Sequence, residues 1–108
     1  MSQPRYQIVF MTAAKHEEAV RIAETLVERN LAACVNIVES CRSIYRWEGK
    51  IVKDDEVMMF AKTRRDRFDA VVETVTELHS YDVPEIIAAD IESLSPGYGG
   101  FLRDVLGV

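Results

Sequence analysis

The chain has 108 residues, which suffices for a single domain over residues 1–108 with its own hydrophobic core and leaves no room for a second one. Thirteen basic and eighteen acidic residues give a formal net charge of −5, which argues against nucleic-acid and anionic-membrane partners, because binding to phosphates needs a basic face. Since no apolar run approaches the roughly 20 residues that span a bilayer and the N-terminus lacks an export-signal pattern, we expect a cytoplasmic protein whose natural ligands are cations.

The first two predicted elements are a central strand and an amphipathic helix. Residues 5–11 end in a continuous apolar run, which indicates a strand buried on both faces. Apolar residues then recur at helical spacing within residues 17–27, after two acidic residues that suit a helix N-terminus. We expect Thr12 to cap this helix and Asn30 to end it in a left-handed conformation.

Two strand-like runs of unusual length, residues 33–47 and 50–63, predict a long hairpin. At about 3.3 Å per residue, the limb from Val35 to Trp47 would extend roughly 43 Å, whereas a compact chain of this size has a radius of gyration near 13 Å. The hairpin must therefore rest on something beyond its own core, and further copies of the chain are the simplest partner. Its apolar alternation breaks over residues 39–43, where we expect a bulge or sharp twist.

The hairpin also contains both cysteines and an acidic run. Cys34 and Cys41 would lie about 23 Å apart at strand rise, too far for a disulfide, so we predict two buried free thiols in a reducing compartment. Residues 54–56 are all acidic but lack the spacing of a calcium loop, and we interpret them as a solvated stretch.

The rest of the chain predicts a helix, a strand and a final helix. Thr63 begins a capping pattern before the apolar stripe of residues 68–78, and this helix should end near His79. Residues 85–91 predict the last strand. A Ser-Pro pair at 95–96 then opens a short helix.

The element order β-α-β-β-α-β with an appended helix indicates an α+β fold, the ferredoxin-like split βαβ arrangement. Right-handed crossovers give an antiparallel sheet with strand order 4-1-3-2 and a protruding hairpin. This layout brings seven residues that are distant in sequence to one edge of the sheet. They are Met11, Thr12, His16, Trp47, His79, Tyr81 and Glu85.

Four sequence blocks resemble the CutA family of divalent-cation tolerance proteins: residues 30–37 (NLAACVNI), 43–51 (SIYRWEGKI), 62–63 (KT) and 79–87 (HSYDVPEII). The resemblance implies a ferredoxin-like subunit that forms a homotrimer with the long hairpins packed between subunits. The trimer architecture it implies is similar to that of PII signal proteins. It further implies a role in tolerance of copper and other divalent metal cations.

The resemblance is incomplete at the metal ligands. In bacterial members the proposed copper ligands are a cysteine at the end of the first strand and two histidines at the end of the second helix. Here Met11 stands at the cysteine position, Leu78 at the first histidine and His79 at the second. A thioether and one imidazole make a weaker site that favours Cu(I). The segment 98–102 also departs from the family pattern.

The predicted metal ligands are His79, His16 and Met11, and each has a structural alternative. The alternative for His79 is a histidine at a helix C-terminus, where the negative end of the helix dipole favours the protonated form. His16 is also explained as a solvated residue in the first turn of a helix. Met11 is also explained as core packing.

Two further sets complete the predicted site. The ligand-binding cleft, suited to an anionic or polar small molecule in a PII-like sensory module, comprises Lys62, Tyr81 and Glu85. The trimer interface at the hairpin tip comprises Tyr45, Trp47 and Glu48. The sequence contains no nucleophile-elbow motif, no phosphate-binding glycine loop and no histidine spaced to a reactive Cys or Ser, so we expect no enzymatic activity.

Overall fold

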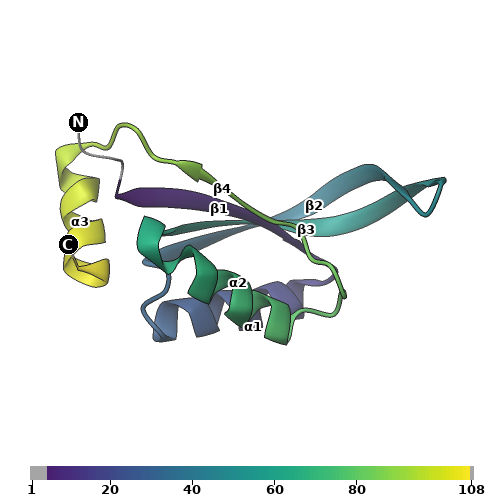
Figure 1. Ribbon diagram of the computed structural model, residues 1–108, viewed down its shortest axis with the longest axis horizontal. Coiled ribbons are helices and arrows are strands. Elements are labelled where there is room, and N and C mark those ends of the chain that lie inside the picture. Colours follow the sequence, from purple (N-terminus) through teal and green to yellow (C-terminus); the bar gives the residue numbers. More distant parts are fainter. Residues whose placement is uncertain (1–4, 108) are drawn as a thin grey trace.

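The computed structural model describes residues 5–107 as a four-stranded sheet with two helices on one face and a third helix across one end (Figure 1). The elements in chain order are β1 (Tyr6–Ala13), α1 (His16–Glu28), β2 (Cys34–Trp47), β3 (Lys50–Arg64), a 3₁₀ turn (Arg65–Arg67), α2 (Phe68–Leu78), β4 (Ile86–Asp90) and α3 (Pro96–Leu106). No helix among these residues is both long and apolar enough to cross a membrane.

The sheet has the order β2-β3-β1-β4, and each neighbouring pair is antiparallel. This order confirms the predicted ferredoxin-like arrangement. As a result, the loop between α2 and β4 lies at the same end of the body as the start of α1 and the point where β2 and β3 leave it (Figure 1).

The predicted hairpin is present and projects from the body as a two-stranded ribbon (Figure 1). The principal extents are 44 × 29 × 23 Å and the Cα radius of gyration is 14.6 Å, above the roughly 13 Å of a compact chain of this length. Glu48 and Gly49 form its turn with φ of 50° and 78°, the two positive values of a tight type I′ hairpin. The predicted bulge is also present, as a register shift between Val38 and Cys41.

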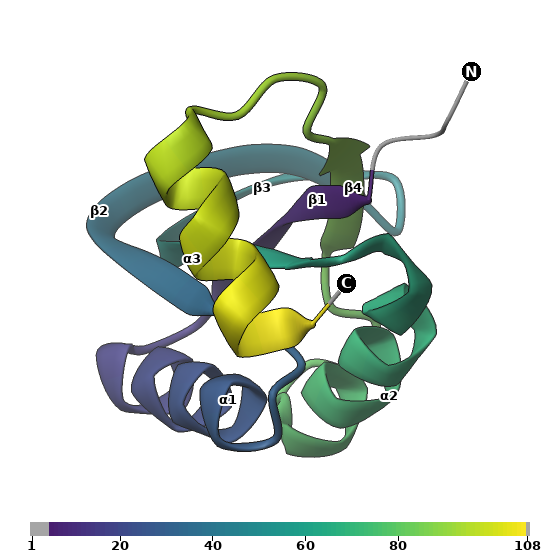
Figure 2. The same cartoon turned by 90° about the vertical axis from the view of Figure 1, so that its left-hand side faces the viewer.

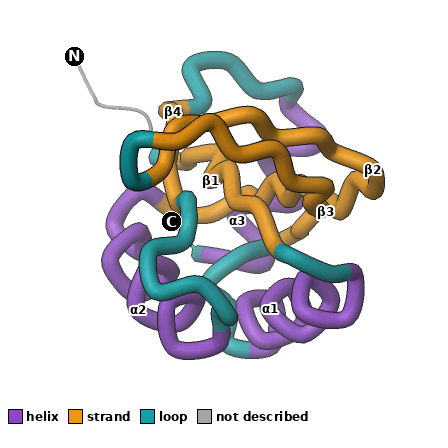
Figure 3. Tube along the Cα trace, turned by 90° about the vertical axis from the view of Figure 1, so that its right-hand side faces the viewer, coloured by secondary structure: helices purple, strands orange, loops and turns teal. Residues whose placement is uncertain are grey.

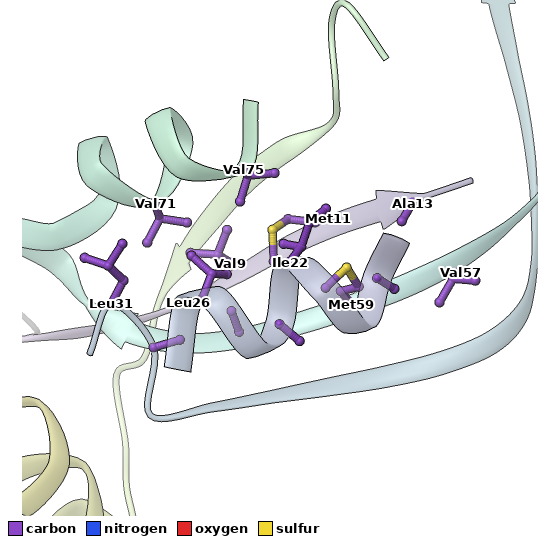
Figure 4. Packing of buried hydrophobic residues seen from close by; sticks show 14 residues of the cluster. Val9, Met11, Ala13, Ile22, Leu26, Leu31, Val57, Met59, Val71 and Val75 are labelled. Atoms are coloured by element: carbon purple, nitrogen blue, oxygen red, sulfur yellow. The ribbon is translucent and has the colours of Figure 1, made fainter. Parts of the chain in front are cut away.

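The main core lies between the sheet and helices α1 and α2, where one side chain in two along β1 and β3 points toward the helices (Figure 4). Met11 and Met59 are paired across these strands and are fully buried there. Helix α3 closes one end of the sheet, as Figure 2 shows, and buries Leu102 and Leu106 in a second cluster.

The other face of the sheet is uncovered along the ribbon and β4, because α1 and α2 lie on one side only (Figure 3). Phe10 and Phe60 meet edge to face on this side, with ring centroids 5.6 Å apart. Ile87 is 55% exposed, and Val38 is also exposed. We call this surface, formed by Ile8, Phe10, Val38, Met58, Phe60 and Ile87, the open sheet face.

Both predicted threonine caps are wrong. Thr12 pairs with Met58 in the sheet, and α1 starts after Lys15 without a side-chain cap. Thr63 lies in β3, where its buried hydroxyl donates to the carbonyl of Leu31, and the 3₁₀ turn precedes α2. The predicted start of α3 at the Ser-Pro pair is confirmed, and Ser95 Oγ caps it by accepting from the Tyr98 amide at 3.4 Å. The two cysteines are free as predicted but only half-buried.

Candidate functional site

The predicted edge of the sheet carries a groove of about 630 Å³ between the ribbon and the α2–β4 loop. The loop is tied to the ribbon by Tyr81, whose hydroxyl donates to Glu56 Oε2 at 2.9 Å. Burial and this hydrogen bond to a carboxylate raise the pKa of the Tyr81 phenol, which therefore stays protonated as a donor. The groove unites four of the seven residues expected at this edge: Thr12, Trp47, Tyr81 and Glu85.

His79 occupies the expected position at the end of α2, but its side chain is only 1% exposed. Nε2 donates to the Thr12 carbonyl at 2.7 Å, and Nδ1 accepts from the Tyr81 amide at 3.0 Å. This pattern assigns the neutral tautomer with the proton on Nε2. Because both ring nitrogens have protein partners, His79 has no free lone pair for a metal.

Glu18 links the start of α1 to the loop that follows His79. Its Oε1 accepts from the Ser80 amide at 2.6 Å, and its Oε2 accepts from the Ser80 hydroxyl at 3.0 Å. Burial alone would raise the pKa of the Glu18 carboxyl, but the hydrogen bonds from Ser80 and from the Ala14 amide lower it below its usual range. Glu18 is therefore a carboxylate that the fold stabilises in its ionised form.

We predict that Glu18→Gln lowers the free energy of unfolding by about 1 to 3 kcal/mol at pH 7. Since folding lowers the pKa of Glu18, its stabilising effect is present above the unfolded pKa and is lost as pH falls through the folded one. Wild-type and variant stabilities should thus converge in acid. Urea denaturation at pH 7 and below pH 4, at the same protomer concentration, measures the difference in stability between wild type and variant. Glu17→Gln, which alters an exposed side chain, is the control. A gap that is constant with pH would contradict it.

His16 is the accessible histidine, with a side chain 55% exposed. Its Nδ1 lies 3.0 Å from Glu39 Oε2, and this hydrogen bond with its attendant charge attraction raises the pKa of His16. Nε2 has no hydrogen-bond partner within residues 5–107. Metal-binding histidines are oriented in the same way, with a carboxylate hydrogen-bonded to one ring nitrogen while the other nitrogen is free for the metal.

The other predicted residues do not converge on the groove within one chain. Lys62 is paired with Ile8 and Cys34, six positions along β3 from Glu56, and its ammonium lies 3.7 Å from Cys34 Sγ. Met11 is in the core. Residues 5–107 of one chain hold no group of three His, Cys, Asp or Glu side chains placed to bind a metal, and the predicted ligands His79 and His16 are each hydrogen-bonded to other residues.

At the ribbon tip, the predicted interface residues Tyr45, Trp47 and Glu48 are all exposed in the single chain. The Tyr45 hydroxyl donates to the Asp54 carboxylate. The interpretation of residues 54–56 as a solvated stretch is wrong for Glu56, which is 7% exposed. Along β3 it lies on the same side as Met58 and Phe60, the side of the open sheet face, and it is covered there by Tyr81 of the α2–β4 loop, a contact that no local sequence signal indicates.

Residues 7–105 match the family model described as CutA1 divalent ion tolerance protein. The chain belongs to the CutA1 divalent ion tolerance family. The divalent-cation tolerance protein CutA of Thermus thermophilus is 44% identical over 94% of this chain and 98% of its own length, and its structure superposes with a TM-score of 0.91 at 43% identity, covering 94% of this chain and 99% of that one.

Other CutA1 relatives differ in length and in the compartment their names give. The CutA structure from Archaeoglobus fulgidus, described as periplasmic, has a TM-score of 0.90 at 39% identity over 94% of this chain and 98% of that one. The chloroplastic CutA of Arabidopsis thaliana is 39% identical over 90% of this chain, which spans 53% of that protein. The chain thus spans about half the length of this plant relative.

Proposed function

We propose that this protein contributes to divalent-cation tolerance as a non-catalytic homotrimer that binds cations weakly in clefts between subunits. The observation that carries the proposal is the large apolar surface that one chain leaves uncovered. Beyond the open sheet face, the ribbon exposes Ile44, Trp47 and Ile51. Soluble monomers rarely expose contiguous apolar patches of this kind, which mark interaction surfaces.

Further copies of the chain are the partner that fits this surface best. The ribbon extends beyond the core that could shelter it, and a rotationally symmetric assembly covers the same surface on every copy. Three is the number that the family resemblance implies. The free thiols of Cys34 and Cys41 favour a reducing compartment such as the cytoplasm.

Metal binding in this proposal depends on His16 and not on His79. An exposed imidazole with a carboxylate behind it is a single ligand, which supports affinity well below that of closed three- or four-ligand sites. Copper is the divalent metal best suited to a lone imidazole, by its place in the affinity order of divalent ions.

Calorimetric titration of the metal-free protein with Cu(II), with light scattering behind a sizing column on the same samples, tests the proposal. We predict a trimer mass, weak heat in the wild type, loss of most of that heat in His16→Ala and retention in His79→Gln. A folded monomer at micromolar concentration would refute the assembly. Heat that depends on His79 and not on His16 would refute the metal site.

A sensory module that binds a small molecule is the second candidate function. The groove between the ribbon and the α2–β4 loop favours it, because a volume of about 630 Å³ lies within the usual range for small-molecule sites and exceeds what a single ion needs. In this function the ribbon would transmit occupancy of the groove to the neighbouring subunits.

A further inference from the structure

The groove has a one-sided charge. Among the described residues that line it, four are acidic and none is basic. The acidic residues are Asp54, Glu56, Asp82 and Glu85. None of the four forms an ion pair with a residue in the range 5–107. Uncompensated carboxylates around one concave surface attract cations, since the low-dielectric walls concentrate their field.

Glu56 shows that this is more than a solvated acidic surface. Glu56 is only 7% exposed, and one of its carboxylate oxygens accepts a hydrogen bond from the Tyr81 hydroxyl. The other oxygen has no hydrogen bond to any described residue while the side chain lines the groove. This second oxygen is therefore available in the groove to a hydrogen-bond donor, and a positively charged donor would form the stronger bond.

The lining also contains aromatic side chains suited to an organic cation. Tyr45 and Trp47, which are also predicted interface residues, come from β2, and Tyr81 comes from the opposite wall. Aromatic faces attract alkylammonium groups, and Trp does so most strongly. They also cover methylene groups, which a bare metal ion does not have.

The spacing of the carboxylates excludes a compact metal site within one chain and fits a longer cation. Residues 5–107 hold no group of three acidic, His or Cys side chains close enough to bind one ion. Asp54 and Glu56 lie two positions apart on β3, which puts them on the same face at a separation of roughly 6.6 Å. Asp82 and Glu85 lie on the loop opposite. Several separated negative charges match several separated ammonium groups.

We propose that this groove binds an aliphatic polyamine, with its ammonium groups on the carboxylates and its methylene segments against the aromatic side chains. The inference deepens the second candidate function, on which it rests, by naming the chemical class of the small molecule. Glu56 binds one ammonium at the floor of the groove, and Glu85 binds another at its rim.

Titration calorimetry of the full-length protein with spermidine at low, fixed ionic strength tests the inference. We expect saturable binding that weakens about tenfold or more in Glu56→Gln, the loss expected for one charge-assisted hydrogen bond. Glu85→Gln, which alters an exposed side chain, should weaken binding as well and covers the case in which the Glu56 variant fails to fold. Glu73→Gln, on the outer side of α2, removes the same charge elsewhere and should stay within about twofold.

Three results would overturn the inference. Equal weakening in Glu73→Gln would show that spermidine senses only net charge. Displacement of spermidine by Mg²⁺ at matched ionic strength would assign the groove to a metal. If spermidine does not bind the intact trimer and Glu56→Gln dissociates that trimer, then a neighbouring copy fills the groove. Light scattering on the same samples reports assembly separately, so a failed trimer and a failed groove give different results.

Discussion

Ile87→Glu is expected to convert the proposed trimer into folded monomers. Ile87 lies on β4 at the edge of the open sheet face and is 55% exposed in the single chain, so a glutamate there remains hydrated in the monomer. In the assembly the same carboxylate would be buried without a partner on every copy, at a cost of several kcal/mol each. Since about 1.4 kcal/mol changes an equilibrium constant tenfold, the assembly should not persist at micromolar concentration.

Light scattering behind a sizing column gives the mass, and far-ultraviolet circular dichroism shows whether the fold is retained. Val27→Glu is the matched control, because Val27 is an apolar residue of α1 that is 39% exposed and lies away from the open sheet face. It should leave the mass unchanged. If Ile87→Glu kept the trimer mass, the open sheet face would not be the interface, and the clefts assigned to it would have no basis.

The fold was predictable because its strongest signals are periodic. The long apolar and alternating runs define β1 and the ribbon, and the break in alternation at residues 39–43 corresponds to the register shift between Val38 and Cys41. Such a pattern averages over many residues and reflects which side of a strand is buried. Single-residue substitutions within it barely alter the prediction.

The two threonine caps were not predictable, since each depends on one side chain that has a competing partner. Thr12 and Thr63 both precede helical stripes, yet each belongs to a strand whose ladder continues past it. The hydroxyl of Thr63 is used by Leu31, which is 32 positions away in the sequence. A local capping signal cannot show that a distant carbonyl takes the same donor.

The sequence predicts where the candidate site lies, but it does not predict what each residue does there. Chain topology alone brings Tyr81 and Trp47 to one groove. The role of His79 depends on the Thr12 carbonyl and the Tyr81 amide, and the burial of Glu56 depends on the loop that covers it. These contacts join separate elements, so only the folded arrangement reveals which histidine is free.

His79→Ala is expected to lower the free energy of unfolding by about 2 to 4 kcal/mol per protomer. Removing the ring leaves the Thr12 carbonyl and the Tyr81 amide without their partners, and it empties space in a side-chain position that is 1% exposed. Glu18 also loses a neighbouring group that lies 3.4 Å away. Urea denaturation at a fixed protomer concentration measures the change, because stability of an oligomer depends on concentration.

His16→Ala supplies the control, since the chain has two histidines and they differ in burial more than in chemistry. Its exposed pair with Glu39 contributes little to stability, so the denaturation midpoint should barely move. The two variants should therefore behave in opposite ways: His79→Ala reduces stability, whereas His16→Ala reduces copper binding. A stable His79→Ala protein that has lost copper binding would reverse both assignments and would make the buried imidazole a ligand exposed by a local opening of the α2–β4 loop.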